Sequence, residues 1–362
     1  MKRFGIISIC RILILILSAL LIWGFTSFYD DGVDVISELK FKNNGNWDGN
    51  SVVYGYVTSW SKDLPDPFSV THLSYAFATI DSTFTTLTIK NLDRFKDIVG
   101  LKKQNNKLKV LLSIGGWGAG NFSEMAADDG NRTEFIHNLM NIVRTYNLDG
   151  IDIDWEFPGS SLGKISSSKE DKSNFTVLMR QIRDSIGRDR VLTFASPAYG
   201  NYYDFEDLVP VVDFVNIMTY DMGVPPKLSA PLHQSPNTGK ICVDYVVANH
   251  YKWGVPVNKM LIGIPFYGRG DDKEYKKFHD YRYIVPKAGT QVCFDSIAMS
   301  PYIIDSASGN ILISYDDTTA VKAKCKYVKE IGARGVMFWH YCGDKKNGEL
   351  LHAINSELNF VK

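Results

Sequence analysis

Three acidic residues alternate along one short stretch of the sequence, Asp149-Gly-Ile-Asp-Ile-Asp-Trp-Glu156. Side chains of a β-strand point alternately to opposite faces, so Asp152, Asp154 and Glu156 share one face, and the apolar residues between them share the other. Burying a carboxylate is costly unless it is paired or protonated. We therefore interpret the acidic face as a catalytic site in which neighbouring acids push one another's pKa values apart.

A divalent-metal site is the main alternative for these acids, because hard cations prefer oxygen ligands. Three acids along one strand cannot surround an ion by themselves, and the cysteine spacings match no zinc pattern. We therefore expect neither a metal nor a cofactor. Asp149 has the wrong parity to share the acidic face and is interpreted as structural.

The composition is that of a globular protein with one large domain or two average ones: 362 residues, 45% hydrophobic and 22% charged. Because 40 basic residues balance 40 acidic ones, no overall field would attract nucleic acid or anionic lipid. Aromatic residues are abundant, with 20 Phe, 19 Tyr and 7 Trp. Some of them must be core, but such a supply also suits stacking against an apolar ligand face.

The N-terminus is typical of a targeting segment. Lys2, Arg3 and Arg11 precede an apolar run from Ile12 to Phe25, which is short for a membrane span and typical of a secretory signal. We expect residues 1–28 to be a signal peptide or, since no small-residue cleavage site follows, an uncleaved signal-anchor. Either way the protein is expected outside the cytoplasm, secreted or in contact with the membrane only through that segment.

Residues 29–50 are predicted to be a linker, because they are polar and glycine-rich towards their end, and residues 51–362 the catalytic domain. Four cysteines lie in that domain, and they can form disulfides or remain buried thiols: Cys242, Cys293, Cys325 and Cys342.

Eight short apolar segments have the character of strands, and most alternate with helical patterns. The predicted strands are 51–58, 71–78, 109–116, 149–156, 191–195, 211–220, 259–265 and 335–339, and the predicted helices are 91–106, 132–147, 170–187, 241–253 and 318–331. Eight β/α repeats predict an α/β TIM barrel, whereas a doubly wound sheet would carry a Gly-x-Gly-x-x-Gly turn after its first strand. Residues 267–316, after strand seven, are too long for a loop and predict a small inserted subdomain.

In a TIM barrel, function lies at the carboxyl ends of the strands. Around the three acids, this chain places there a set of aromatic and polar residues that we predict to bind substrate: Tyr56, Trp60, Phe77, Gly116, Trp117, Met218, Tyr220, Asp221, Tyr267, Arg269 and Trp339. Tyr56, Phe77 and Tyr267 can equally be core residues. Aromatic platforms suit the apolar faces of sugar rings, and the acids suit protonation of a glycosidic oxygen.

The acidic stretch has the spacing Asp149-x-x-Asp152-x-Asp154-x-Glu156. Ser113-x-Gly-Gly-Trp117 precedes it in the chain, and Met218-x-Tyr-Asp221 and Phe338-Trp339 come after it. In these four motifs, which occur in the family's order, the chain resembles the family 18 glycoside hydrolases, the chitinases, and the resemblance covers residues 51–355. By resemblance, residues 267–316 correspond to the α+β insertion domain of the deep-cleft chitinases, in a shortened form.

The resemblance implies a role for each matching residue. Glu156 would be the general acid and then the base, in the substrate-assisted retaining mechanism. Asp154 would orient the substrate's acetamido N–H, and Asp152 would share a proton with Asp154. Tyr220 would donate to the acetamido oxygen and Trp339 would form the floor of the central sugar site, with Trp60 and Trp117 at further subsites.

The resemblance also predicts cis peptide bonds at Glu156–Phe157 and Trp339–His340. His340 departs from the family, which often has Glu or Ser there, and this puts only the local polarity of the cleft in question. Because the insertion is shortened, the cleft depth and processivity of the family are not carried over to this chain.

The predicted activity is hydrolysis of β-1,4-linked N-acetylglucosamine chains by an endo-acting, monomeric enzyme. Other hydrolases of the family, an endo-β-N-acetylglucosaminidase or a peptidoglycan glycosidase, would use the same Glu156 chemistry. A non-catalytic chitinase-like lectin is the alternative from another class, but such proteins typically lose the acid that Glu156 retains. No nucleic-acid partner is expected.

Overall fold

The computed structural model describes residues 35–40, 42 and 51–359. The predicted leader, residues 1–28, lies outside these ranges. Within the described ranges, no helix is both long and apolar enough to cross a bilayer.

Part of the predicted linker is helical. Residues 35–40 form a helix whose Ile36 and Leu39 are buried against the core, and Lys40 forms an ion pair of 2.9 Å with Glu330. The glycine- and asparagine-rich residues 43–50 dominated the sequence prediction, whereas the apolar i, i+3 spacing of Ile36 and Leu39 is a weak signal over so short a stretch.

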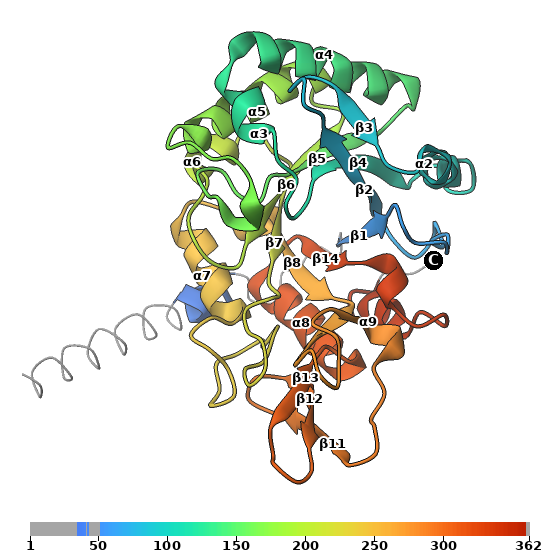
Figure 1. Ribbon diagram of the computed structural model, residues 1–362, viewed down its shortest axis with the longest axis vertical. Coiled ribbons are helices and arrows are strands. Elements are labelled where there is room, and N and C mark those ends of the chain that lie inside the picture. Colours follow the sequence, from blue (N-terminus) through green and yellow to red (C-terminus); the bar gives the residue numbers. More distant parts are fainter. Residues whose placement is uncertain (1–34, 41, 43–50, 360–362) are drawn as a thin grey trace, which may run out of the picture.

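Between residues 51 and 359, eight parallel strands close into a barrel, which confirms the predicted TIM architecture (Figure 1). Closure is seen in the pairing of β1 with both β2 and β14. In chain order the barrel strands are β1 (Val52–Thr58), β2 (His72–Ile80), β4 (Lys109–Gly115), β5 (Gly150–Asp154), β6 (Val191–Pro197), β7 (Phe214–Met218), β8 (Met260–Pro265) and β14 (Gly335–Trp339). A short strand that the sequence did not indicate, β3 (Leu87–Ile89), extends β2 in the antiparallel sense.

The outer helices lie close to their predicted positions: α2 (Leu92–Gly100), α4 (Asp129–Thr145), α5 (Asp171–Ile186), α7 (Val243–Lys252) and α8 (Thr318–Ile331). Local signals explain their ends. Asp128 caps α4 by accepting from the N–H of Asn131, and Asp317 caps α8 in the same way. Gly332 ends α8 in the left-handed conformation with φ 72°. Three further helices were not predicted, α3 (Phe122–Ala127), α6 (Phe205–Leu208) and α9 (Glu349–Glu357).

The two faces of β5 serve different purposes. Ile151, Ile153 and Trp155 are fully buried on the helix side, where the Trp155 ring stacks on Phe122 at 5.3 Å between centroids. Trp155 is therefore a packing residue, and the acids on the other face point into the barrel. This alternation fixes the direction of the acids, because a slip of one residue would reverse every side chain of the strand.

Residues 267–314 form a five-stranded antiparallel sheet after β8, with strand order β10-β9-β13-β12-β11. The strands are β9 (Tyr267–Gly270), β10 (His279–Asp280), β11 (Thr290–Asp295), β12 (Ser300–Asp305) and β13 (Ile311–Ser314). The predicted insertion after strand seven is therefore present, and its helical part is a single 3-10 turn at Tyr281–Tyr283. In Figure 1, β11–β13 lie at the lower end of the molecule, away from α4 and α5.

Within residues 51–359, Cys242, Cys293, Cys325 and Cys342 are free thiols. Cys242, Cys325 and Cys342 are buried, so these three match the alternative in which the cysteines remain buried thiols.

Candidate active site

A cleft of about 840 Å³ lies at the carboxyl ends of the barrel strands. Of the residues predicted for the site, all but Asp152 line it: Tyr56, Trp60, Phe77, Gly116, Trp117, Asp154, Glu156, Met218, Tyr220, Asp221, Tyr267, Arg269 and Trp339. Asp152 lies beneath its floor and is fully buried. The fold thus brings together residues from six strands that are separated by up to 283 positions in the chain.

Asp152 is held by four side-chain donors. Its Oδ2 accepts from the hydroxyls of Tyr56 at 2.9 Å and Ser113 at 2.7 Å. Its Oδ1 accepts from the Thr193 hydroxyl at 2.6 Å and the Asn216 amide at 3.1 Å. Burial raises the pKa of Asp152, while these hydrogen bonds oppose that rise.

The proton shared between Asp152 and Asp154, which the family resemblance implies, stays a prediction. Both oxygens of Asp152 are occupied by hydroxyl and amide donors, and within the described residues no hydrogen bond joins Asp152 to Asp154. These four contacts hold the Asp152 carboxylate in one position below the site.

Asp154 has the opposite environment. Its Oδ1 is buried and has no hydrogen-bond partner among the described residues. Burial, followed by the charges of Glu156 and Asp152, raises the pKa of Asp154 well above its ordinary range. A buried polar atom left unsatisfied costs about 1–3 kcal/mol. Asp154 is therefore poised to accept a partner from a molecule bound in the cleft.

Glu156 lies at the mouth of β5 and lines the cleft. Burial, and after it the charge of Asp221, raises the pKa of Glu156 to about 8. Asp221 is itself held by the Tyr267 hydroxyl at 2.8 Å and faces Arg269 Nε at 3.4 Å. Glu156 therefore carries a transferable proton at neutral pH, as a general acid must.

The aromatic residues form two groups along the cleft. Trp339 stacks with Phe77 at 5.5 Å and an interplanar angle of 20°, and the Trp60 ring lies 6.3 Å from Trp339. In the second group, the Trp117 ring lies 6.5 Å from that of Phe157, which stacks on Tyr202 at 5.0 Å. Trp60 and Trp117 are each 63% exposed, which leaves their ring faces open to a ligand.

Two smaller features shape the centre of the site. Gly116 has φ 93°, and a Cβ atom at this position would lie 2.6 Å from the Phe77 ring, so a side chain here would displace that ring. Among the described residues, the only hydrogen bond of the Tyr220 hydroxyl is a weak one to Met337 Sδ at 3.8 Å, and this leaves it able to donate to a bound molecule.

Both predicted cis peptide bonds are present, at Glu156–Phe157 and Trp339–His340, and another non-proline cis bond is found at Ala76–Phe77. His340 is buried, and its Nε2 lies 3.5 Å from the Asp280 carboxylate of the insertion. Asp149 lies outside the cleft. Its carboxylate accepts from the N–H of Val110 at 2.9 Å and pairs with Lys102 at 2.7 Å.

Sequence reasoning missed several residues of the site. Ser113, Thr193 and Asn216 are polar residues within otherwise apolar strands, and that departure from the strand pattern was a usable signal. The lining residues Phe157, Tyr199 and Phe278 follow strands or lie in the insertion, where sequence gives no side-chain direction.

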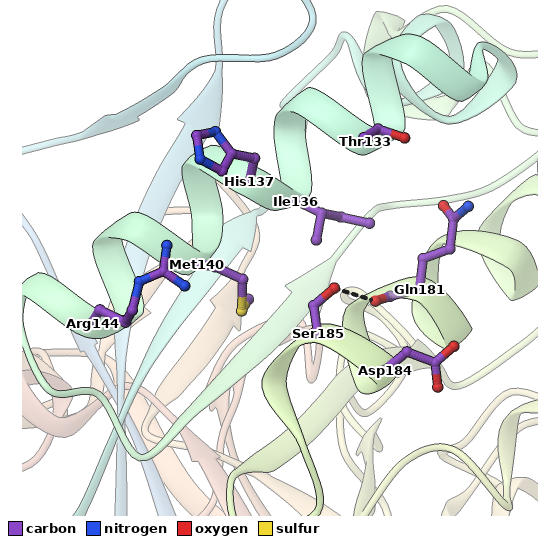
Figure 2. A pocket seen from close by; sticks show the side chains of 8 residues that line it. All are labelled: Thr133, Ile136, His137, Met140, Arg144, Gln181, Asp184 and Ser185. Carbon is purple, nitrogen blue, oxygen red and sulfur yellow. Dashed lines mark hydrogen bonds between the residues drawn. The ribbon is translucent and has the colours of Figure 1, made fainter.

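A second hollow, of about 460 Å³, lies between α4 and α5 on the outside of the barrel (Figure 2). Its polar groups belong to helix surfaces, and the Ser185 hydroxyl donates to the carbonyl of Gln181 in its own helix at 2.9 Å. The part of the chain that the structure describes contains no group of three or more His, Cys, Asp or Glu arranged to hold a metal ion. The barrel cleft, with its acids of perturbed pKa, is therefore the candidate active site.

Comparison with known proteins identifies the fold and the family independently. The sequence model described as Glycosyl hydrolases family 18 matches residues 52–344. Chitinase A1 of Niallia circulans is 30% identical over 84% of this chain and 58% of its own length. Endochitinase 1 of Metarhizium robertsii is 30% identical over 72% of this chain and 68% of its own length.

Solved structures show the same similarity. A family 18 N-acetylglucosaminidase from Paenibacillus barengoltzii is 30% identical with a TM-score of 0.76, and the match covers 86% of this chain and 100% of that one. The chitinase ChiW of a Paenibacillus species has a TM-score of 0.77 at 30% identity, and the match covers 86% of this chain. This chain spans 58% of Chitinase A1 and 33% of ChiW, both of which are longer proteins.

Proposed function

The chain belongs to glycosyl hydrolase family 18 and is a glycoside hydrolase, and we propose that its substrate is chitin or soluble chains of β-1,4-linked N-acetylglucosamine. One observation carries the proposal: Glu156, whose pKa is raised to about 8, lines an aromatic cleft together with Asp154, whose buried Oδ1 has no hydrogen-bond partner among the described residues. An N-acetylated sugar supplies what each group requires, an oxygen to protonate and an amide N–H to bind.

The proposed reaction has two steps and uses one proton donor. Glu156 gives its proton to the glycosidic oxygen as the bond from that oxygen to C1 breaks. The carbonyl oxygen of the sugar's own acetamido group bonds to C1, which gives an oxazolinium ion. Glu156 then removes a proton from water, the water oxygen attacks C1, and the oxazolinium ring reopens. Two inversions at C1 give net retention.

Asp154 and Tyr220, supported by Asp152, would act on the acetamido group of the substrate, whose carbonyl oxygen is the nucleophile. Asp154 would accept from the acetamido N–H and stabilise the positive charge that develops there, and Tyr220 would donate to the acetamido oxygen. Asp152, fully buried beneath them and held by its four donors, would keep this part of the site ordered around Asp154. Trp339 would carry the apolar face of the central sugar.

Chitin is favoured over the other substrates of the family by the number of aromatic residues in the cleft. Trp60, Trp117 and Trp339 all line it, and three such rings can serve more than one sugar. The relatives named above also include a chitinase and an endochitinase. The same experiment would detect cleavage of a branched glycoprotein glycan or of peptidoglycan, if either were the substrate instead.

The test is to incubate the purified full chain with N-acetylglucosamine oligomers, peptidoglycan and an N-glycoprotein, and to identify the products by mass. We expect shorter N-acetylglucosamine oligomers to form, and nuclear magnetic resonance during the first turnovers to show the β-anomer. Cleavage of only the glycoprotein or only the peptidoglycan would overturn the chitin proposal. Release of the α-anomer first would overturn the retaining mechanism.

The pH dependence of the reaction follows from the pKa of Glu156. A general acid works only while protonated, so a pKa raised to about 8 keeps the acid competent through neutral pH. We expect kcat/KM to fall about tenfold per pH unit above the pKa of Glu156. Asp221→Asn removes the charge that helps to raise this pKa, so the alkaline limb should move to lower pH. An unmoved limb in that variant would contradict the assignment.

We also propose that the enzyme acts outside the cytoplasm. The support is the basic, apolar sequence of residues 1–28. Fractionation of cells that express the full chain tests this, with activity expected in the medium or at the outer membrane face. Activity confined to the cytosol would contradict it.

A further inference from the structure

Phe278 is an unusually open aromatic residue within the cleft. It lies in the insertion, lines the cleft and is 59% exposed. It belongs to none of the sequence motifs that match the family. A large apolar side chain left exposed within a binding cleft is a candidate contact for a ligand.

The strand register of the insertion explains why Phe278 faces the cleft. In the antiparallel pair of β9 and β10, His279 lies opposite Gly268, and Asp280 lies opposite Tyr267. Continuing this register by one residue places Phe278 opposite Arg269. Residues directly opposite each other on paired strands project to the same face, and Arg269 lines the cleft. The Phe278 side chain therefore projects to the same face of the strand pair as Arg269, towards the cleft.

Arg269 supports one face of the Phe278 ring. The guanidinium carbon lies 3.9 Å from the ring centroid, a cation–π contact, and the Tyr267 ring lies 5.4 Å away. Arg269 is in turn held beside Asp221 at 3.4 Å. The ring is thus held on one side while much of its surface remains accessible.

The barrel order shows what Phe278 faces. β8, from which the insertion departs, lies four strands from β4 in either direction around the ring of eight. Trp117 follows β4 directly. The insertion wall with Phe278 and the wall with Trp117 therefore stand on opposite sides, and a bound sugar chain would pass between them.

We propose that Phe278 is a further sugar-binding platform of this enzyme, which stacks on the apolar face of a pyranose ring and helps to select N-acetylglucosamine chains. The inference rests on the proposed function and adds a contact from the insertion to it. The ring is backed by Arg269 on one face and offers the sugar an apolar surface that water otherwise covers.

Binding is measured by calorimetry with an N-acetylglucosamine hexamer on the Glu156→Gln background, which prevents turnover. We expect Phe278→Ala to weaken the Kd about tenfold, equivalent to about 1.4 kcal/mol. Phe278→Tyr keeps the ring and should stay within about twofold of its parent, since a twofold change is small beside the loss of a stacked ring. The matched control is Tyr283→Ala, because Tyr283 is also exposed in the insertion, at 63%, but does not line the cleft. It should leave the Kd unchanged.

Steady-state kinetics distinguish direct stacking of Phe278 on a sugar from an indirect effect of Phe278 on Arg269. In the otherwise native enzyme, Phe278→Ala should raise KM and leave both kcat and the alkaline limb of the pH profile in place. If Phe278 acted only by holding Arg269 beside Asp221, its loss would move that limb, because Asp221 helps to set the pKa of Glu156. A moved limb with an unchanged Kd would overturn the inference, as would equal Kd values for Phe278→Ala and its parent.

The two proposals fail in different ways. A parent enzyme that neither binds nor cleaves N-acetylglucosamine oligomers refutes the proposed function itself. A parent that does both, with a Phe278→Ala variant of equal affinity, refutes only the role of Phe278.

Discussion

Glu156→Gln is expected to lower kcat for N-acetylglucosamine oligomers at least about a thousandfold, within the range of general acid–base catalysis, and to leave oligomer binding nearly intact. Glutamine keeps the size and shape of the side chain but has no proton that it can give to the glycosidic oxygen. The aromatic contacts that hold the sugars come from other elements, among them Trp339 on β14 and Trp117 after β4.

The measurement pairs initial rates of oligomer cleavage with a calorimetric Kd for the same oligomer. Glu134→Gln makes the same chemical change on the exposed surface of α4 and serves as the control, with a rate equal to that of the native enzyme. Turnover by Glu156→Gln near the native rate would show that another group supplies the proton, and would remove the basis of the mechanism.

The barrel could be predicted because parallel strands leave a strong signal. They are buried on both faces, so they appear as short apolar runs, and each needs a crossover that appears as an amphipathic helix. The period of two then assigned the faces of residues 150–156 without any structure, and the acids indeed point into the barrel while Trp155 packs outward. Both arguments depend only on local sequence and on the geometry of a strand.

The contacts between distant elements could not be predicted in the same way. Asp152 meets Tyr56 of β1, Thr193 of β6 and Asn216 of β7, and this set depends on barrel closure and on the relative register of the strands. Sequence period gives the face of each strand but not its register against a distant one. The family resemblance implied a proton shared with Asp154, which stays a prediction, but it could not indicate the donors from distant strands that hold Asp152.

The insertion shows the same limit on a smaller scale. Its length predicted an inserted subdomain, yet the two-residue strand β10 was too short to recognise. The direction of Phe278 depends on the pairing of that strand with β9. The result is that the insertion contributes an aromatic residue to the cleft that no motif in the sequence could have indicated.

Asp154→Asn is expected to lower kcat about 10²–10³-fold, the usual loss when one preorganised electrostatic group is removed, with a much smaller change in KM. Asparagine keeps an oxygen that can accept from the acetamido N–H, so the substrate can still be oriented. It cannot take up a negative charge as positive charge develops on the acetamido group during formation of the oxazolinium ion. The loss should therefore appear mainly in the transition state.

The pH profile of Asp154→Asn distinguishes this role from an indirect effect on Glu156. Burial and the charge of Asp221 raise the pKa of Glu156, so the alkaline limb should stay near pH 8 although the rate falls. A substrate whose leaving group needs no proton, such as a 4-nitrophenyl glycoside, should remain sensitive to Asp154→Asn and lose most of its sensitivity to Glu156→Gln. Equal sensitivity of that substrate to both variants would contradict the separate roles, because only Glu156 is expected to serve the leaving oxygen while Asp154 serves the substrate's own nucleophile.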